Sequence, residues 1–407
     1  MSDRKIAEAF ARPKERSATL TKIRNLKMSQ SAHAYVRGNT VKFYEWLAEL
    51  RSGALPDGPP VWICGDCHVG NLGPVANAQG QIEIQIRDLD QTVIGNPAHD
   101  LVRLGLSLAS AARGSDLSGV TTAKMLEQMM DGYEKSFEPD FHEESDVKRP
   151  DSIHLVAKRA AAASWKTLAE ERIEDRRPTI PLGRRFWPIS KDEKREIEEL
   201  FETDDMRKLA TMLRSRDDDA RVKLMDAAYW RKGCSSLGRL RYAVLLRVGG
   251  KKMKKSDYCL MDLKEATQTA APRAAGVKMP SDPAERVVEG ARHLSPNLGK
   301  RMRAVRLMDK PVFVRELLPQ DLKIEVEQLT RDEAMNVAGF LAAVVGKAHS
   351  RQMDSETRKK WQKDLQRNRS TALDAPTWLW TSIVELLADH ERAYLEHCRK
   401  FALEVDA

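Results

Sequence analysis

Two short segments carry the side chains of this sequence that are best suited to chemistry: the loop Gly65–Asn71 (GDCHVGN) and the segment Arg87–Asp90 (RDLD). Mg²⁺ prefers oxygen ligands and is usually held by one or two carboxylates together with substrate phosphates. Asp88 is the candidate for the main metal carboxylate, and Asn71 offers an amide oxygen to the same ion. Asp66 can accept a proton from an attacking hydroxyl. Phosphoryl transfer requires this division of roles.

Two further side chains in these segments have alternative roles. Asp90 is either a second metal ligand or a support that hydrogen-bonds the loop, and we favour the support. His68 either orients the loop backbone or binds a metal, and we favour orientation. Asp66 also has a plainer interpretation, because Asp, Asn and Gly are ordinary turn residues and its side chain can cap a turn. The hairpin predicted beside the loop and the second acidic segment, Arg87–Asp90, favour a chemical role for Asp66.

Cys64 and Cys67 form a CxxC pair at the start of the loop. A zinc site would need two more ligands at suitable spacing, and only His68 is close in the sequence. A thioredoxin-type pair would need a helix that starts at the motif, which a loop rich in turn formers does not predict. We therefore do not expect redox or zinc chemistry here.

The flanking sequence predicts the elements that position the loop. Val61–Cys64 is a short apolar run that suits a buried strand. Gln81–Arg87 alternates between apolar and polar residues, which predicts a second strand, and the stretch 77–80 supplies the turn before it. We expect this strand pair to bracket the polar loop and to end at Asp88. The stretch 101–112 predicts a buried helix.

A second cluster lies far downstream. The turn Gly233–Gly238 (GCSSLG) precedes a predicted strand, and such a turn can bring backbone N–H groups close to phosphates. It is not a Walker A loop, because no Lys-Ser/Thr follows it. The next predicted strand carries Lys264 near its end, and the following helix carries Glu285 and Glu289. We predict that Lys264 contacts nucleotide phosphates and pairs with one of these glutamates. The full set assigned to nucleotide binding is Gly233, Ser235, Ser236, Gly238, Lys264, Glu285 and Glu289.

Composition limits the class of protein. The chain has 407 residues and a formal net charge of +8, which permits anionic partners such as nucleotides. Basic residues are mixed with acidic ones, and the one dense run, over 251–255, suits a solvated hairpin tip, so nucleic-acid binding is not expected. No apolar run is long enough to span a membrane, and the charged N-terminus does not resemble a secretory signal. Five cysteines without a framework pattern predict thiols and a cytoplasmic protein.

The pattern of elements predicts a mixed α+β protein. The stretch 117–225 is expected to be mostly helical, with a loop near 176–190. Strands are predicted over 239–248, 258–263, 303–308 and 312–317, interrupted by a helix over 283–293. Helices follow from 331, with a long one over 378–405. We divide the chain into a catalytic-loop part (1–115), a charged helical part (116–228), a small β-rich lobe (229–328) and a helical C-terminal part (329–407).

The motifs GDCHVGN, RDLD and GNPAHDL resemble the catalytic segment of aminoglycoside phosphotransferases and choline kinases, within the protein-kinase-like superfamily. This resemblance implies that Asp66 is the catalytic aspartate, that Asn71 and Asp88 are metal ligands, and that Asp100 braces the loop. The whole chain is more specifically similar to the bacterial family called domain of unknown function 2252. The segments that carry this similarity lie at 27–38, 65–71, 87–91, 99–107, 233–246, 263–266, 285–292 and 314–323.

The order of the motifs departs from that of ordinary kinases, in which the glycine-rich turn and the lysine precede the catalytic loop. Here they follow it, so the resemblance implies a circularly permuted, two-lobed kinase-like fold. The stretch 337–349 resembles the helix that normally runs just before the catalytic loop. In this sequence Gln91 replaces a more usual carboxylate. Arg37 is expected to form an internal ion pair or to contact a phosphate or carboxylate.

The function expected from the residues and the resemblance is transfer of phosphate from ATP, with Mg²⁺, to the hydroxyl of a small molecule or a protein. In that role Asp66 and His68 form the catalytic pair. The metal set comprises Asn71, Asp88 and Asp90. A pseudokinase or nucleotide-binding regulatory module is the first alternative. A metal-dependent phosphohydrolase is the second, although such dinuclear sites usually need more histidines at strand ends.

Overall fold

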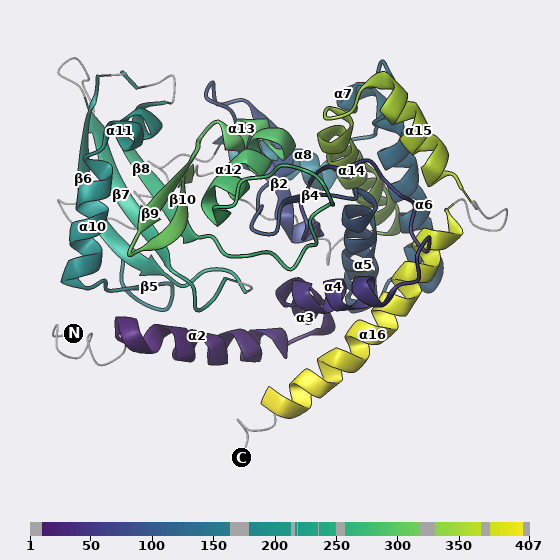
Figure 1. Cartoon of the computed structure of the whole chain (residues 1–407), viewed down its shortest axis with the longest axis horizontal. Coiled ribbons are helices and arrows are strands. Elements are labelled where there is room, and N and C mark those ends of the chain that lie inside the picture. Colours follow the sequence, from purple (N-terminus) through teal and green to yellow (C-terminus); the bar gives the residue numbers. More distant parts are fainter. Residues whose placement is uncertain are drawn as a thin grey trace.

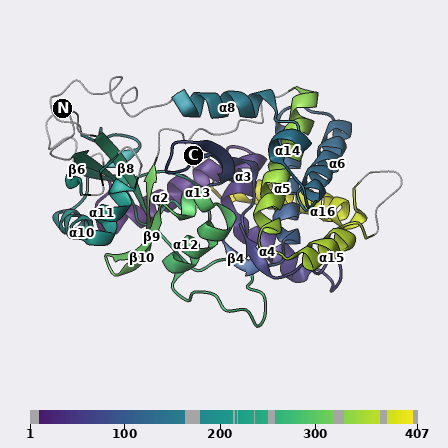
Figure 2. The same ribbon diagram turned by 90° about the horizontal axis from the view of Figure 1, so that it is seen from above.

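The computed structural model describes residues 10–162, 179–212, 216–217, 219–234, 236–249, 257–317, 330–367 and 375–401. It shows a mixed α+β protein, with an antiparallel sheet at one end of the long axis and a body of helices at the other (Figure 1). The view from above gives the same separation, with helix α12 (Pro283–Leu294) between the two ends (Figure 2). The α+β class predicted from the sequence is confirmed.

The sheet has six strands in the order β5-β6-β7-β8-β10-β9, and every neighbouring pair is antiparallel. Alternation along the strands separates two faces. One face packs against helices α2 (Pro13–Met28), α10 (Lys191–Phe201) and α11 (Asp204–Thr211). The other face turns α12 and a row of charged side chains toward the helical body. The strands are β5 (Phe186–Trp187), β6 (Arg221–Trp230), β7 (Arg241–Gly249), β8 (Asp257–Glu265), β9 (Met302–Leu307) and β10 (Lys310–Leu317).

Four short strands surround the acidic loop. β1 (Val61–Ile63) pairs with β4 (Val93–Gly95), and β2 (Leu72–Ala76) pairs with β3 (Ile82–Ile86). The predicted pairing of the first strand with the strand over 81–87 was therefore wrong. The reason is an unpredicted strand, β2, which contains Gly73 and Pro74 and so lacks the apolar alternation on which the prediction relied. The one-turn helix η1 (Val69–Asn71) connects the loop to β2.

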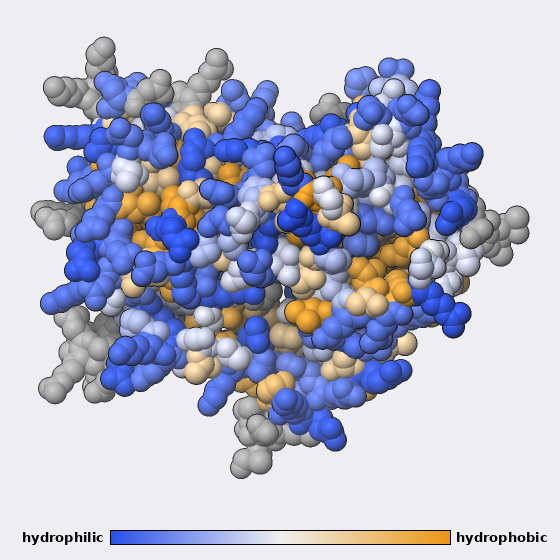
Figure 3. Space-filling view, viewed as in Figure 1, coloured by the Kyte–Doolittle hydropathy of each residue, from blue (hydrophilic) through white to orange (hydrophobic). Residues whose placement is uncertain are grey.

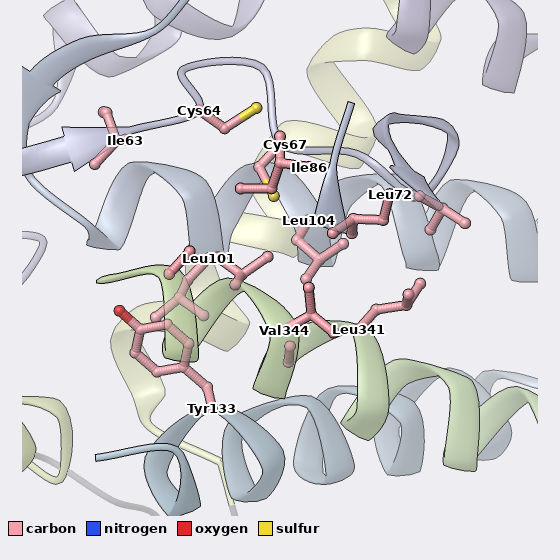
Figure 4. Close-up of a cluster of buried hydrophobic side chains, with 14 of the residues drawn as sticks. Ile63, Cys64, Cys67, Leu72, Ile86, Leu101, Leu104, Tyr133, Leu341 and Val344 are labelled. Carbon is pink, nitrogen blue, oxygen red and sulfur yellow. The ribbon is translucent and has the colours of Figure 1, made fainter. Parts of the chain in front are cut away.

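The helical body is built around close contact between two helices, α6 and α14. An added Cβ at Gly132 of α6 would lie 2.1 Å from the carbonyl oxygen of Gly339 in α14, so only glycine permits this approach. Helix α5 packs on this pair, and its buried leucines lie beneath the loop (Figure 4). The helices outside the sheet layer are α3 (Ala32–Gly38), α4 (Thr40–Glu49), α5 (Ala98–Gly114), α6 (Gly119–Lys135), α7 (Glu143–Asp146), α8 (Asp151–Ala162), α14 (Arg331–Ser350), α15 (Ser355–Leu365) and α16 (Thr377–Phe401).

Most of the elements predicted downstream are present, including the helix now seen as α12 and the C-terminal helices. The stretch 117–225 is mostly helical over its described residues, as predicted, but the start of β6 was not expected, and β5 lies within the predicted loop near 176–190. Its helices α10 and α11 pack on the sheet together with α2. The division of the chain into four parts remains a prediction.

The exposed face of the molecule is mainly polar and charged (Figure 3). Among the described residues, no helix is long and apolar enough to cross a membrane. The lysine run over 251–255, the 318–323 end of the segment over 314–323 and Ser235 lie outside the described residues.

Candidate functional site

The acidic loop is held at its start by a buried carboxylate. Asp100, in the first turn of α5, accepts hydrogen bonds from the backbone N–H groups of Cys64 (2.7 Å) and Gly65 (2.9 Å). His349 of α14 lies 3.2 Å from the same carboxylate. The predicted bracing role of Asp100 is confirmed by these contacts. The helix that carries His349 comes late in the sequence and lies next to the loop in space.

Gly65 allows the loop to turn sharply. Its φ is +73°, and an added Cβ would lie 2.1 Å from the carbonyl oxygen of Gln91. A side chain at this position would therefore be strained and would clash with the segment after Asp90. Gln91 itself accepts a hydrogen bond from the backbone of Ala270 through its side-chain oxygen (2.8 Å). The residue whose role the sequence left open thus connects the acidic segment to the chain that follows β8.

Asp66 is buried and paired with a cation that the sequence analysis did not single out. Arg103 of α5 donates from Nε to Oδ1 of Asp66 at 3.0 Å, and its Nη2 lies 2.9 Å from the same oxygen. The polar side chain of Thr40 also favours the ionised form of Asp66. Burial raises the pKa of the Asp66 carboxyl, although Arg103 and Thr40 oppose the increase. An aspartate with a raised pKa is better suited to accept a proton than an ordinary one.

His68 and Asn71 complete the loop. The His68 Nε2 lies 4.0 Å from Oδ2 of Asp66, and burial lowers the pKa of His68 well below its ordinary value, helped by Arg37 and Arg103. The ring is therefore neutral at pH 7. Asn71 donates from Nδ2 to the backbone oxygen of Asp66 at 2.9 Å, which leaves its amide oxygen for another partner. The loop thus brings Asp66, His68 and Asn71 together, as predicted.

Lys264 joins the two sequence clusters. It lies on β8, its side chain is 2% exposed, and its Nζ lies 3.2 Å from Oδ1 of Asp88 and 2.6 Å from Oδ2 of Asp90. Asp88 is the most open of the three aspartates, with 38% of its side chain exposed against 11% for Asp66 and Asp90. The ammonium group therefore faces the segment that was predicted to bind metal, 176 positions earlier in the chain.

The pKa values of the two carboxyls beside Lys264 are shifted in opposite directions. Burial raises the pKa of Asp90 to about 6, and the negative charge of Asp88 adds to the increase. For Asp88 burial acts in the same direction, but the positive charges of Lys264 and Arg315 outweigh it and hold the pKa below its usual range. Asp88 is therefore the carboxylate that stays ionised to the lower pH. It is the better metal ligand of the two, and Asp90 suits the supporting role.

A charged network lies beside Lys264 on the same face of the sheet. Arg241 of β7 makes two hydrogen bonds to Asp262 of β8, at 2.8 and 2.6 Å, and Arg315 of β10 bonds the same carboxylate at 3.2 Å. Arg315 also donates to the backbone oxygen of Arg87 at 2.7 Å. The sheet is thereby tied directly to the segment that precedes Asp88.

The predicted pairing of Lys264 with Glu285 or Glu289 is not formed. Glu285 is exposed, and Glu289 bonds Arg292 (2.9 Å) and His293 (3.3 Å) on its own helix. The apolar positions of α12 fix which side packs on the sheet, and both glutamates fall on the other side. The residue of α12 that reaches the site is Arg286, which donates to the backbone oxygens of Asp90 (2.7 Å) and Thr267 (3.1 Å).

The turn Gly233–Gly238 connects β6 and β7 and lies against the N-terminal helices. Gly233 and Gly238 both have positive φ, +89° and +95°, and the Lys27 ammonium of α2 lies 3.4 Å from the Gly233 carbonyl oxygen. Ser236 donates to the Lys232 carbonyl oxygen at 3.2 Å. The turn ends at β7, where Arg241 lies directly opposite Lys264.

Arg37 lies between the turn and the acidic loop. Its guanidinium rests on Gly70, where an added Cβ would come within 2.7 Å of Nη2. The positive charge of Arg37 acts on the pKa of both His68 and Cys234, so Arg37 is near both clusters. Within the described ranges Arg37 has no ion-pair partner, so the predicted internal ion pair is absent there.

Cys64 and Cys67 are free, buried and close to each other. Their mutual hydrogen bond and burial raise the pKa of Cys64 well above its ordinary value. Thiols of this kind react slowly. The described part of the chain also contains no group of three His, Cys, Asp or Glu residues placed to hold a metal ion. The pair is part of the core under the loop (Figure 4).

Sequence reasoning missed several charged residues of the site. The available signal was a charge between two apolar neighbours, as at Arg103 and Asp262, because a buried charge requires a partner. A search for such positions would have found Arg103, Arg241 and Asp262, whereas Arg286 and Arg315 each have one charged neighbour.

The arrangement defines a mixed α+β protein in which a buried acidic loop on a helical body faces basic side chains on one face of an antiparallel sheet. The chain belongs to the family described as uncharacterized protein conserved in bacteria (DUF2252), and the match covers residues 16–400. Neither the curated proteins nor the solved structures contain a significant match to it.

Proposed function

We propose that this protein is an ATP- and Mg²⁺-dependent phosphotransferase with a circularly permuted kinase-like fold, acting on a hydroxyl acceptor. The observation that carries the proposal is the contact of Lys264 with Asp88 and Asp90, at 3.2 and 2.6 Å. A lysine and a metal-binding carboxylate must lie this close to act on one set of phosphates. The sequence alone did not require that proximity.

The order of the elements supports the permutation. The strand with Lys264 is followed by helix α12, then by β9 and β10, and later by α14, whose His349 contacts the carboxylate that braces the loop. The elements of a nucleotide lobe thus follow the catalytic half in sequence while they contact it in space.

The donor groups fit magnesium. Asp88 provides a partly exposed, ionised carboxylate. Asn71, at the end of the acidic loop, provides an amide oxygen that its hydrogen bond to Asp66 leaves available. Two protein ligands are enough for Mg²⁺, because substrate phosphates and water usually complete its octahedron. When bound, the ion would neutralise charge on the phosphates. The protein's own part is to hold these ligands still and to keep Asp66 near the acceptor.

The cations around the loop suit the remaining charge of a nucleotide. Lys264, Arg37 and Arg241 line the side of the site where the turn Gly233–Gly238 enters β7. Asp66, with its pKa raised by burial, would orient or deprotonate the acceptor hydroxyl. Catalysis would come mainly from positioning and charge neutralisation.

One observation favours the alternative of a pseudokinase or nucleotide-binding module. Lys264 has no glutamate partner on α12 within the described residues, and an arginine reaches the site instead. This alternative has the same nucleotide site but transfers no phosphate to an acceptor. The phosphohydrolase alternative gains no support, because the described residues hold no cluster of three metal-binding side chains.

The test is a comparison of Asp66→Asn with wild type. Transfer of phosphate from γ-labelled ATP to a fractionated bacterial metabolite extract should fall by a factor of about 10² to 10⁴, as expected for loss of a general base. ATP binding should stay within about twofold, because Asp66 is not assigned to the nucleotide. Asp57→Asn, at an exposed position, is the matched control. ATP binding with no transfer by wild type would favour the pseudokinase, and near wild-type transfer by Asp66→Asn would contradict the assigned role.

A further inference from the structure

The C-terminal end of helix α2 lies next to helix α3, and both helices touch the turn Gly233–Gly238 (Figure 1). The Lys27 ammonium of α2 lies 3.4 Å from the Gly233 carbonyl oxygen. An added Cβ at Gly38, the last residue of α3, would lie 3.0 Å from Sγ of Cys234. Cys234 is only half-buried, so this junction of two helices and a turn is partly open to solvent.

Three half-buried cations surround Cys234 at this junction, and we call them the basic cluster: Arg24 and Lys27 of α2, and Arg37 of α3. Each of their positive charges lowers the pKa of the Cys234 thiol, against the larger increase that burial causes. Burial and the positive charge of Arg231 lower the pKa of Lys27 itself. The junction therefore has an excess of positive charge.

Within the part of the chain that the structure describes, no acidic side chain forms an ion pair with the basic cluster. By contrast, Arg16 on the same helix α2 is paired with Glu193. Lys27 and Arg37 lie in the last turns of their helices, where the helix dipole favours a cation. Arg24 lies a turn earlier, so the dipole does not account for three like charges at one place. Their mutual repulsion would be relieved by a bound anion.

The basic cluster reaches the acidic loop through Arg37. The guanidinium of Arg37 rests on Gly70, where an added Cβ would come within 2.7 Å of Nη2. The charge of Arg37 also lowers the pKa of His68, whose Nε2 lies 4.0 Å from Oδ2 of Asp66. A small molecule with an anionic group on the cluster would therefore have the rest of its structure beside the acidic loop.

The kind and number of the cations limit the anion. A guanidinium can form two parallel hydrogen bonds with a phosphate or a carboxylate, and lysine adds a point charge. Three positive charges match the double charge of a phosphate group better than the single charge of a carboxylate. In the proposed function the nucleotide phosphates are bound by Lys264 and a metal ion. Arg24 and Lys27, on a helix that precedes the acidic loop, are therefore available to a second ligand.

We infer that the basic cluster binds the phosphate group of the acceptor, so that the acceptor is a small phosphorylated molecule with a free hydroxyl beside Asp66. The binding of a phosphate by Arg24, Lys27 and Arg37 follows from the cluster alone. The identity of that ligand as the acceptor rests on the proposed function.

The test is calorimetric titration of glycerol 3-phosphate, and of glycerol as its neutral counterpart, into the full chain saturated with Mg²⁺ and a non-hydrolysable ATP analogue. Wild type should bind glycerol by at least about tenfold more weakly than glycerol 3-phosphate, because glycerol lacks the charged group. Arg24→Met and Lys27→Met should each weaken binding of glycerol 3-phosphate by about tenfold or more. Lys22→Met, at an exposed position of the same helix, is the matched control and should stay within about twofold of wild type.

Three results would overturn the inference. The first is that wild type binds glycerol 3-phosphate no better than glycerol, and the second is that Arg24→Met and Lys27→Met bind it as wild type does. The third is binding that is present without the ATP analogue and lost with it, which would assign the basic cluster to the nucleotide.

The same titrations without nucleotide separate this inference from the proposed function. Binding of glycerol 3-phosphate that is lost in Arg24→Met, in a wild-type protein that does not bind the ATP analogue, would support the phosphate site and contradict the proposed function. Binding of the ATP analogue without any binding of glycerol 3-phosphate would overturn the phosphate site alone.

Discussion

The acidic loop over 65–71 and the charged face of the sheet around Lys264 are both buried and charged, but they are held in different ways. The loop is held mainly by backbone hydrogen bonds to Asp100 and by one guanidinium, that of Arg103. The charged face of the sheet is held by ion pairs, with Asp262 between Arg241 and Arg315, and Lys264 between two aspartates.

The difference appears in the pKa values of the acidic side chains of the two regions. Burial raises the pKa of Asp66 on the loop, where one arginine opposes it. Burial also acts on Asp262, but two arginines outweigh it and hold its pKa below the usual range. The loop therefore resembles a preorganised catalytic element. Under the proposed function the contacts of Lys264, by contrast, would be exchangeable, because nucleotide phosphates and a cation would replace its two carboxylates.

The largest expected effect comes from Asp262→Asn, which tests the charged face of the sheet. Removing this carboxylate leaves Arg241 and Arg315 without their shared partner and should lower the free energy of unfolding by about 3–5 kcal/mol at pH 7. Because the folded pKa is depressed, the stabilisation is present above the unfolded value near 3.8 and is lost as the pH falls below it. The difference in free energy of unfolding between wild type and Asp262→Asn, measured by urea denaturation, should be smaller at pH 3 than at pH 7. An equal difference at both values would contradict the account.

A somewhat smaller loss is expected from Arg103→Met, which tests the loop. The methionine fills the space but leaves Asp66 buried without its cation, so unfolding should become easier by about 3 kcal/mol. Arg113→Met is the matched control on the same helix, because its ion pair is exposed and should contribute at most about 1 kcal/mol. Thermal unfolding of wild type, Arg103→Met and Arg113→Met measures these two losses of stability. If both variants lost the same small amount, Asp66 would not depend on Arg103.

The smallest effect should come from Glu285→Gln and Glu289→Gln. Neither side chain reaches Lys264, so ATP affinity should stay within about twofold and stability within about 0.5 kcal/mol. Arg286→Gln is the contrasting variant, since Arg286 bonds the backbone of Asp90, and it should weaken ATP binding more than either glutamate variant. A tenfold loss from one glutamate would restore the lysine–glutamate pair that the sequence predicted.

The two regions also differ in how well the sequence predicted them. The loop side chains Asp66, His68 and Asn71 lie within a few residues of one another, so a local motif was sufficient to bring them together. Lys264 was identified as a site residue, but its aspartate partners were not. A contact across 176 positions depends on which face of β8 and which face of α12 turn toward the acidic segment. Glu285 and Arg286 are adjacent on α12, yet Glu285 is exposed and Arg286 reaches the site.

The fold shows the same limit. Regular alternation predicted β3, β7 and β8, and helical spacing predicted α12 and α14. β2 escaped because glycine and proline break its pattern, and β6 because its charged start resembles the helices before it.

The central claim is that the acidic loop and Lys264 form one nucleotide site. The most direct measurement is calorimetric titration of ATP, with and without Mg²⁺, into wild type and Lys264→Met, with Lys310→Met as the exposed control on the same sheet. The account predicts magnesium-dependent binding that weakens at least tenfold in Lys264→Met and stays within about twofold in the control, since tenfold corresponds to about 1.4 kcal/mol. No binding to wild type at millimolar ATP, or equal binding by wild type and Lys264→Met, would contradict it.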